Sequence, residues 1–122
     1  MSYEGERQDL RVRTKLFALR IIKMCGTLPI TREGRILGDQ IFRSGTSVGA
    51  NYREAYRARS KAEFISKLGD SQKELEETIY WMELLLETGT VKEKKMALLL
   101  TEADELMAII SAIIKSSRSS SS

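Results

Sequence analysis

Two groups of arginine and lysine residues are the part of this 122-residue sequence best suited to chemistry with a ligand. The denser group consists of Arg53, Arg57, Arg59 and Lys61, and the other consists of Arg13, Arg20 and Lys23, with Arg11 and Lys15 nearby. A guanidinium group is planar and forms paired hydrogen bonds to a phosphate or a carboxylate. We therefore interpret six residues as candidate contacts to the phosphates of a nucleic acid: Arg13, Arg20, Arg53, Arg57, Arg59 and Lys61.

The uneven distribution of charge leaves a second interpretation open. Residues 1–61 hold 13 Lys and Arg against 6 Asp and Glu, a net charge of +7, and ten of these cations are Arg. Residues 62–122 hold 7 against 11, a net charge of −4. The basic half is suited either to binding a nucleic acid or to docking on the acidic half of a neighbouring copy of the chain.

Three other motifs indicate packing or solvation rather than ligand binding. The segment GTSVGAN at 45–51 is rich in glycine, but it lacks the Gly-Lys-Ser/Thr ending of a phosphate-binding loop, and no strand precedes it. The glutamates of 74–87 would need histidine partners to build the dinuclear iron site of some bundles, so we interpret them as a solvated face or as partners in salt bridges between subunits. Tyr80 and Trp81 lie off the main apolar row, and we expect them to pack at an interface.

Missing residue types exclude several classes of site. The chain has no histidine, which removes the usual general base and the commonest transition-metal ligand. Its single cysteine, Cys25, cannot form an internal disulfide or a thiolate metal site within one chain, and we expect it to be a small buried hydrophobe. The sequence therefore predicts a non-enzymatic protein with no cofactor and no metal, although an enzyme that uses Glu, Lys or Tyr is a remaining alternative.

The sequence also predicts a cytoplasmic location and no membrane partner. No apolar run approaches the ~20 residues that span a bilayer. The first residues, MSYEGERQDLRVR, contain acids and no apolar segment of the kind found in a secretory signal.

Apolar residues recur at helical spacing in four segments, which we expect to be helices over about 8–25, 32–56, 60–87 and 91–116. The third has an unbroken alternation of spacings of four and three, and Ser60 and Glu63 have the spacing of a capping box at its start. Short connections join the segments, as in a bundle whose successive helices run up and down. The sequence thus predicts one all-α domain over 1–116, an antiparallel up-down-up-down four-helix bundle, and a disordered Ser-rich tail over 117–122.

Two features of these helices concern contacts with a neighbouring helix. The first helix has one apolar row for a core and a second row roughly opposite it, formed by Val12, Leu16 and Leu19, which favours contact with another subunit. In the second helix, Gly38, Gly45 and Gly49 lie on one line. Each glycine costs up to about 1 kcal/mol relative to alanine in a helix interior. We therefore expect another helix to approach closely there.

Dispersed residues between 43 and 86 carry a resemblance to a known family. The pieces that match are Arg43-Ser44, Ser47-Val48-Gly49-Ala50-Asn51, Glu54-Ala55, Ser60, Glu63-Phe64, Lys67-Leu68, Glu74, Glu77-Thr78 and Tyr80-Trp81. They resemble the signature of small bacterial four-helix-bundle proteins, some of which are encoded in intervening sequences of large-subunit ribosomal RNA genes. A related branch is the accessory variability determinant of diversity-generating retroelements. Tyr52 and Arg53 depart from the pattern, which has small or aliphatic residues there more often.

The resemblance implies the same bundle fold, assembled as a ring-like homopentamer, with RNA or DNA as a partner. By analogy with the retroelement branch, it also implies a reverse transcriptase as a partner. Together with the arginine groups, it predicts a non-enzymatic oligomer that binds structured RNA or DNA through Arg-rich surfaces, mostly by recognising shape. The alternative is a protein–protein interaction scaffold that uses these arginines between chains and binds no nucleic acid.

Overall fold

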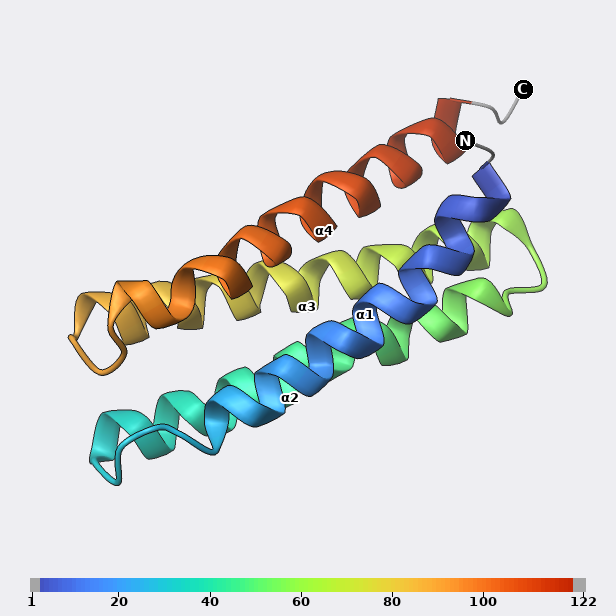
Figure 1. The fold of residues 1–122 in the computed structure, drawn as a ribbon. Coiled ribbons are helices and arrows are strands. Elements are labelled where there is room, and N and C mark those ends of the chain that lie inside the picture. The colour runs from blue at the N-terminus through green and yellow to red at the C-terminus, as the bar shows by residue number, and fades with distance from the viewer. Residues whose placement is uncertain (1–2, 120–122) are drawn as a thin grey trace.

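The computed structural model describes residues 3–119, with side chains from Leu10 onward. Four helices make up this part of the chain: α1 Tyr3–Cys25, α2 Arg32–Tyr56, α3 Lys61–Glu87 and α4 Glu93–Ser119. They run alternately up and down and are joined by short connections (Figure 1). The predicted all-α, up-down four-helix bundle is therefore confirmed.

Two helices start two or more residues away from the positions that the apolar pattern predicts, and α3 starts one residue late, at Lys61. α1 begins at Tyr3 rather than at residue 8. Adding a residue to an existing helix is much easier than starting a new one, so α1 extends beyond the apolar residues that define its core face. α4 begins at Glu93 rather than at Val91. The Val91 backbone N–H donates to the Leu85 carbonyl (3.2 Å), so Val91 belongs to the turn that ends α3.

The end of α4 also differs from the prediction. The helix continues through Ser119, past its expected end at residue 116. Ser117 is buried, so the additional turn packs against the bundle. Residues 117–119 of the predicted disordered tail are therefore helical, and residues 120–122 lie outside the described residues.

Side chains cap the second and third helices at their N-termini. The Thr31 hydroxyl accepts a hydrogen bond from the Gly34 N–H (3.1 Å) at the start of α2. At the start of α3, the Ser60 hydroxyl accepts from the Glu63 N–H (3.0 Å), and the Glu63 carboxylate accepts from the Arg59 N–H (3.1 Å). The Ser60–Glu63 capping that the sequence indicates is confirmed, and it orders the connection between α2 and α3.

Glycines on α2 allow α1 to pack closely against it. A Cβ atom added at Gly45 would lie 2.9 Å from Cγ1 of Ile21, and one added at Gly49 would lie 3.1 Å from Oγ1 of Thr14. Both partner side chains belong to α1 and are fully buried. The predicted close approach of a helix is confirmed at Gly45 and Gly49, and the helix is α1. At Gly38 the close neighbour is instead Leu28, in the connection between α1 and α2.

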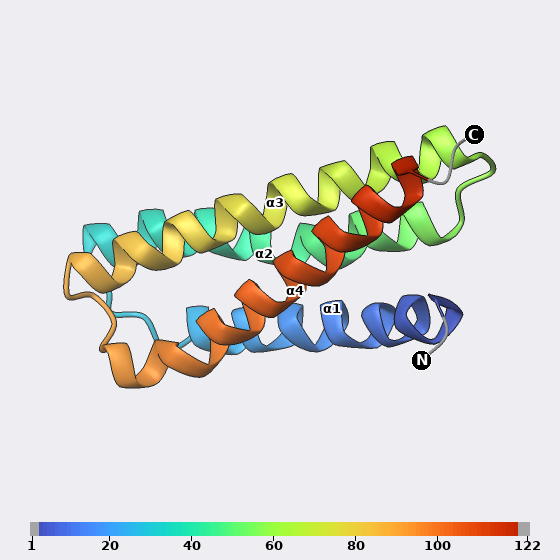
Figure 2. The same cartoon turned by 90° about the horizontal axis from the view of Figure 1, so that it is seen from above.

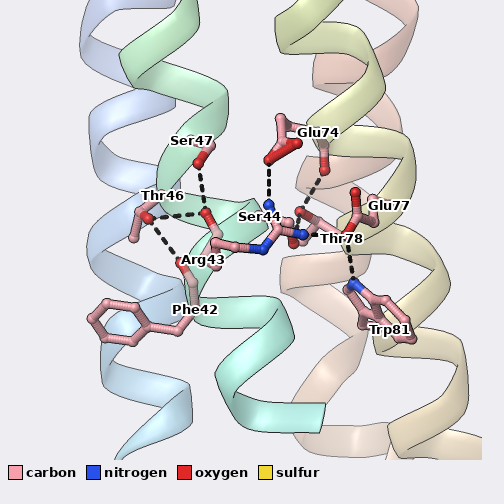
Figure 3. A network of polar contacts seen from close by, with 9 residues as sticks. All are labelled: Phe42, Arg43, Ser44, Thr46, Ser47, Glu74, Glu77, Thr78 and Trp81. Atoms are coloured by element: carbon pink, nitrogen blue, oxygen red, sulfur yellow. Dashed lines mark hydrogen bonds and ion pairs between the residues drawn. The ribbon is translucent and has the colours of Figure 1, made fainter. Parts of the chain in front are cut away.

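Hydroxyl groups join α2 to α3 inside the core. The Ser71 hydroxyl donates to the Val48 carbonyl (2.8 Å), and the Thr78 and Ser44 hydroxyls are 2.7 Å apart (Figure 3). The three hydroxyl side chains are fully buried, and each has a hydrogen-bond partner, which removes the cost of burying them.

α4 is inclined to α1 (Figure 2), and these two helices contact each other least among the four adjacent pairs. The second apolar row of α1 is open to solvent in the single chain: Val12 is 58% exposed, Leu16 53% and Leu19 52%. The row is thus where the sequence places it, on the side of α1 that faces away from the core.

Within residues 3–119, no helix has the combined length and apolar character needed to cross a membrane.

Candidate nucleic-acid interface

Arg53 and Arg57, which the sequence places on one helix face, lie at the C-terminal end of α2 and line a small cavity. The cavity has a volume of about 260 Å³ and is also lined by Arg11, Glu54 and Tyr56. Since a water occupies about 30 Å³ of liquid volume, the space is large enough for a phosphate group with several waters. We call this cavity the arginine pocket.

Arg11 comes to the arginine pocket from α1, and aromatic side chains hold it in place. Its guanidinium carbon lies 4.1 Å from the centre of the Tyr56 ring, which is cation–π geometry. The Tyr56 ring in turn packs against Tyr52, with ring centres 6.5 Å apart. Because Tyr52 is fully buried, Arg11 is connected to the hydrophobic core through two aromatic rings.

The charge in the arginine pocket is incompletely balanced within the described residues. The Nε atom of Arg11 is buried and has no hydrogen-bond partner among them. The one carboxylate in the lining, that of Glu54, forms a salt bridge with Lys67 (3.2 Å). Arg53 and Arg57 also lie at a helix C-terminus, where the helix dipole favours cations. Three guanidinium groups therefore face a cavity that suits an anion.

Arg59 and Lys61 lie beside this end of the bundle, in the connection from α2 and at the first position of α3. Both side chains are exposed, and neither lines the arginine pocket. Only the backbone of Arg59 takes part in the capping contact with Glu63. Four of the six predicted binding residues therefore lie at one end of the bundle.

Arg13 and Arg20 face α4 instead. The Arg13 side chain donates to Glu102 through Nε (3.1 Å) and Nη2 (2.6 Å), and Glu105 lies 3.7 Å from the same nitrogen. This pairing offsets much of the Arg13 charge. Arg20 lines a different, larger groove between α1 and α4. The structure thus separates these two residues from the arginine pocket.

Two of the α3 glutamates pair with an arginine of the same chain. Glu74 and Glu77 both bind Arg43 of α2, at 3.1 Å for Glu74, and the Trp81 indole N–H donates to Glu77 (3.3 Å; Figure 3). The expectation for the glutamates is a solvated face or salt bridges between subunits; for these two residues, the structure shows salt bridges within one chain. Among the described residues, no group of His, Cys, Asp and Glu is arranged to hold a metal ion.

Cys25 is half-buried near the end of α1, and its thiol is poorly reactive at neutral pH. Burial raises the pKa of the Cys25 thiol to about 11, and the nearby carboxylate of Asp39 adds to the effect. Its sulfur lies 3.6 Å from the Gly38 carbonyl oxygen, to which the thiol donates. A protonated, weakly donating thiol agrees with the interpretation of Cys25 as a small hydrophobe.

Sequence reasoning did not identify Arg11 or Tyr56 as members of a site. Arg11 is 42 positions before Arg53, and the spacing of residues within one helix gives no information on which helix lies next to it. The available signal was the excess of arginine in residues 1–61. It shows which half of the chain carries the positive charge, but not which arginines lie close together in the fold.

Comparison with known proteins gives a family match over most of the chain. The family described as 23S rRNA-intervening sequence protein matches residues 7–112. A crystal structure from Bacteroides thetaiotaomicron VPI-5482, described as a protein with unknown function from the S23 ribosomal protein family, is 35% identical in sequence. The similarity covers 90% of this chain and 98% of that one, with a TM-score of 0.82. Among proteins of curated function, none matches this chain.

Proposed function

The chain belongs to the 23S rRNA-intervening sequence protein family, and we propose that it is a non-enzymatic oligomer that binds structured RNA or DNA through the arginine pocket. The observation that carries the proposal is the convergence of Arg11, Arg53 and Arg57 on one cavity. Their guanidinium groups suit the oxygens of a backbone phosphate, and Arg59 and Lys61 extend the basic surface beside it.

The expected recognition is of the sugar-phosphate backbone and its shape rather than of base sequence. The arginine pocket offers three cations and one tyrosine, Tyr56, whose ring is already in contact with Arg11. A surface that reads bases needs free aromatic faces or paired donors and acceptors for base edges. Contacts to phosphates give binding that weakens strongly with salt and tolerates changes in sequence.

Self-association forms part of the proposal, because one arginine pocket offers only a few phosphate contacts. The exposed apolar row of α1 supports assembly, since a single chain leaves Val12, Leu16 and Leu19 more than half exposed. A ring such as the homopentamer suggested by the sequence resemblance would repeat the arginine pocket around its axis. Several copies that engage one nucleic acid together bind far more tightly than one copy alone.

The alternative function is a protein–protein interaction scaffold that binds no nucleic acid. The pairing of Arg13 with Glu102 and of Arg43 with Glu74 shows that arginines of this chain do bind carboxylates. In a scaffold, the arginine pocket would receive a carboxylate of another protein. A reverse transcriptase remains a proposed partner, by analogy with the retroelement branch alone.

Substitution of the pocket arginines distinguishes the two functions. In the variant Arg53→Gln/Arg57→Gln, we expect weaker binding to a short duplex RNA and to a duplex DNA of equal length, measured by fluorescence anisotropy over a series of salt concentrations. For duplex DNA, the slope of log affinity against log salt should become shallower by about 0.9 for each phosphate that the variant no longer neutralises. Oligomeric mass and circular dichroism should be unchanged, because both side chains are exposed.

The matched control is Arg32→Gln/Arg35→Gln. It removes the same two charges from the same helix, but from exposed positions at its opposite end. Equal weakening by both variants would mean that net charge, and not the arginine pocket, carries the binding. If the unmodified protein binds neither duplex at low salt, the nucleic-acid function is wrong and the scaffold is favoured.

A further inference from the structure

A groove with cations around an apolar floor lies between α1 and α4, away from the arginine pocket. Its volume is about 630 Å³, and we call it the α1–α4 groove. Four cations line it: Arg20 and Lys23 from α1, Lys92 from the connection before α4, and Lys95 from α4. No Asp or Glu is among the described residues that line it. The groove therefore has an uncompensated positive charge.

The α1–α4 groove is open because these two helices meet at only part of their length. Arg13 of α1 and Glu102 of α4 bridge the two helices by paired hydrogen bonds. Further along, toward the end of α1 and the start of α4, the groove opens, and Leu98 at its edge is 78% exposed. A leucine this exposed beside a groove marks a surface that is suited to covering by an apolar group.

The lining indicates the chemistry of the group that fits. Met24, Val91 and Leu98 provide apolar surface, which gains nothing from a phosphate backbone. Among the residues that the structure describes, no aromatic side chain lines the groove, which therefore offers no platform there for stacking a nucleic-acid base. The combination of an apolar floor and four cations instead suits a protein surface with one large apolar side chain surrounded by carboxylates.

The same chain presents such a surface on the outer side of α3. Tyr80 is 52% exposed, and its ring packs at 5.1 Å against that of Trp81, which limits its movement. Glu76, Glu83 and Glu87 stand four residues before, three after and seven after Tyr80, so they lie next to it on the helix surface. All three are exposed, and within the described residues none of them forms a salt bridge. We call these four residues the Tyr80 ridge.

We propose that the α1–α4 groove of one copy receives the Tyr80 ridge of a second copy. The inference rests on the self-association that forms part of the proposed function, and it names the two surfaces that meet. The ridge supplies one aromatic ring for the apolar floor and three carboxylates for the four cations. The net charges of the two halves of the sequence, +7 before residue 62 and −4 after it, have the same complementarity.

The positions of the two surfaces in the bundle allow every copy to use both. Within the described residues, the backbones of α1 and α3 do not approach each other closely, because these helices are diagonal in the bundle. A copy can therefore offer its groove to one neighbour and its ridge to another, which is the head-to-tail arrangement that gives rings.

Reversal of charge on each surface tests the pairing. The groove variant is Lys23→Glu/Lys95→Glu, and the ridge variant is Glu83→Lys/Glu87→Lys. All four side chains are exposed, so we expect both variants to fold, as judged by circular dichroism. In light scattering after size exclusion, each variant alone should shift from an oligomer toward the 13.8 kDa monomer. The groove variant loses the net positive charge of its groove, from +4 to 0, and places two glutamates opposite the ridge carboxylates. The ridge variant places two lysines opposite the four groove cations.

Mixing the two variants in equal amounts should restore association, because the glutamates introduced in the groove of one then meet the lysines introduced on the ridge of the other, and the unchanged groove and ridge meet each other. The control is Arg32→Glu/Arg35→Glu, which changes the net charge as much as the groove variant does but on α2. This control should remain oligomeric. Its association with the ridge variant should be no stronger than that of the unmodified protein with the same variant.

Three other outcomes would contradict the pairing of groove and ridge, and they can be told apart. An unmodified protein that is monomeric throughout the micromolar range removes both the proposed self-association and this inference. Variants that keep the oligomeric mass of the unmodified protein leave self-association in place but show that other surfaces meet. Loss of association in the groove variant alone, or without recovery on mixing, means that the groove binds some acidic surface other than the Tyr80 ridge.

Discussion

Replacement of Gly45 by alanine should destabilise the bundle, although alanine is the better helix former. The added Cβ would lie 2.9, 3.0 and 3.3 Å from three side-chain atoms of Ile21. Two of these distances are at or below the limit of real Cβ contacts, and a β-branched side chain inside a helix has one strongly preferred rotamer, so Ile21 cannot turn away. Overpacking of this kind costs about 1–3 kcal/mol.

The gain in helix propensity opposes this cost but does not cancel it. Alanine in a helix interior is favoured over glycine by about 1 kcal/mol. We therefore expect a net loss of roughly 0–2 kcal/mol for Gly45→Ala. Gly69 provides the matched control, because it lies inside α3 and a Cβ added there would meet nothing within 4 Å. Gly69→Ala should stabilise the protein by up to about 1 kcal/mol.

The difference between the two substitutions is the quantity to measure. Urea denaturation followed by circular dichroism gives the free energy of unfolding of each variant at one protein concentration, since any association contributes to stability. In an Ile21→Ala background, the two closest contact atoms are absent and only Cβ remains, at 3.3 Å, so Gly45→Ala should change from destabilising to neutral or stabilising. If Gly45→Ala and Gly69→Ala stabilise equally, the close packing of α1 on α2 is wrong.

Three further predictions concern single residues. Gly34→Ala should cost more stability than Gly45→Ala in the same denaturation assay, because the added Cβ would lie 2.2 Å from the backbone oxygen of Pro29, which cannot rotate away. The Cys25 thiol should react about a hundredfold more slowly than an unfolded control with a thiol reagent at pH 8, because a pKa raised to about 11 keeps it protonated, and the rate should rise as the pH approaches 11; equal rates would contradict its burial. Tyr56→Leu should weaken nucleic-acid binding about two- to fivefold at constant helicity, since it removes the cation–π contact that positions Arg11, and unchanged affinity would show that Arg11 needs no such support.

The helices and the close contact of α2 with a neighbour could be predicted from the sequence, because both depend on spacing within one segment. The apolar row of α3 and the glycine line of α2 are local patterns. The burial of Tyr52 could not be predicted in this way, although it is among the largest fully buried side chains. α2 packs against both α1 and α3, so its buried surface is wider than one row, and Tyr52 lies in the added width.

The partners in the surface salt bridges could not be predicted from the sequence either. Glu74 and Glu77 have the spacing of an exposed acidic face, which the sequence indicates. That Arg43 bridges both depends on how far α3 is shifted along α2, and no local pattern sets this shift. The charge of a residue on a helix surface is known from the sequence alone. Its salt-bridge partner is known only from the packing of the helices.

The arginine pocket shows how such a shift creates a site. If the connection at 26–31 simply reversed the chain, residues at equal distances from its midpoint would face each other, and Arg11 would lie near residue 46 of α2. In the structure, Arg11 instead contacts Tyr56, about ten residues further along.

The cause of the shift lies in the connection itself. A Cβ added at Gly38 would lie 2.9 Å from the side chain of Leu28, so the first turns of α2 pack beside the connection and only the last residue of α1. The C-terminal end of α2 is thereby brought level with the first half of α1, and Arg53 and Arg57 meet Arg11 there. The cluster of like charges is therefore a consequence of helix register, and the packing of Leu28, Gly34 and Gly38 at the far end of the bundle maintains it.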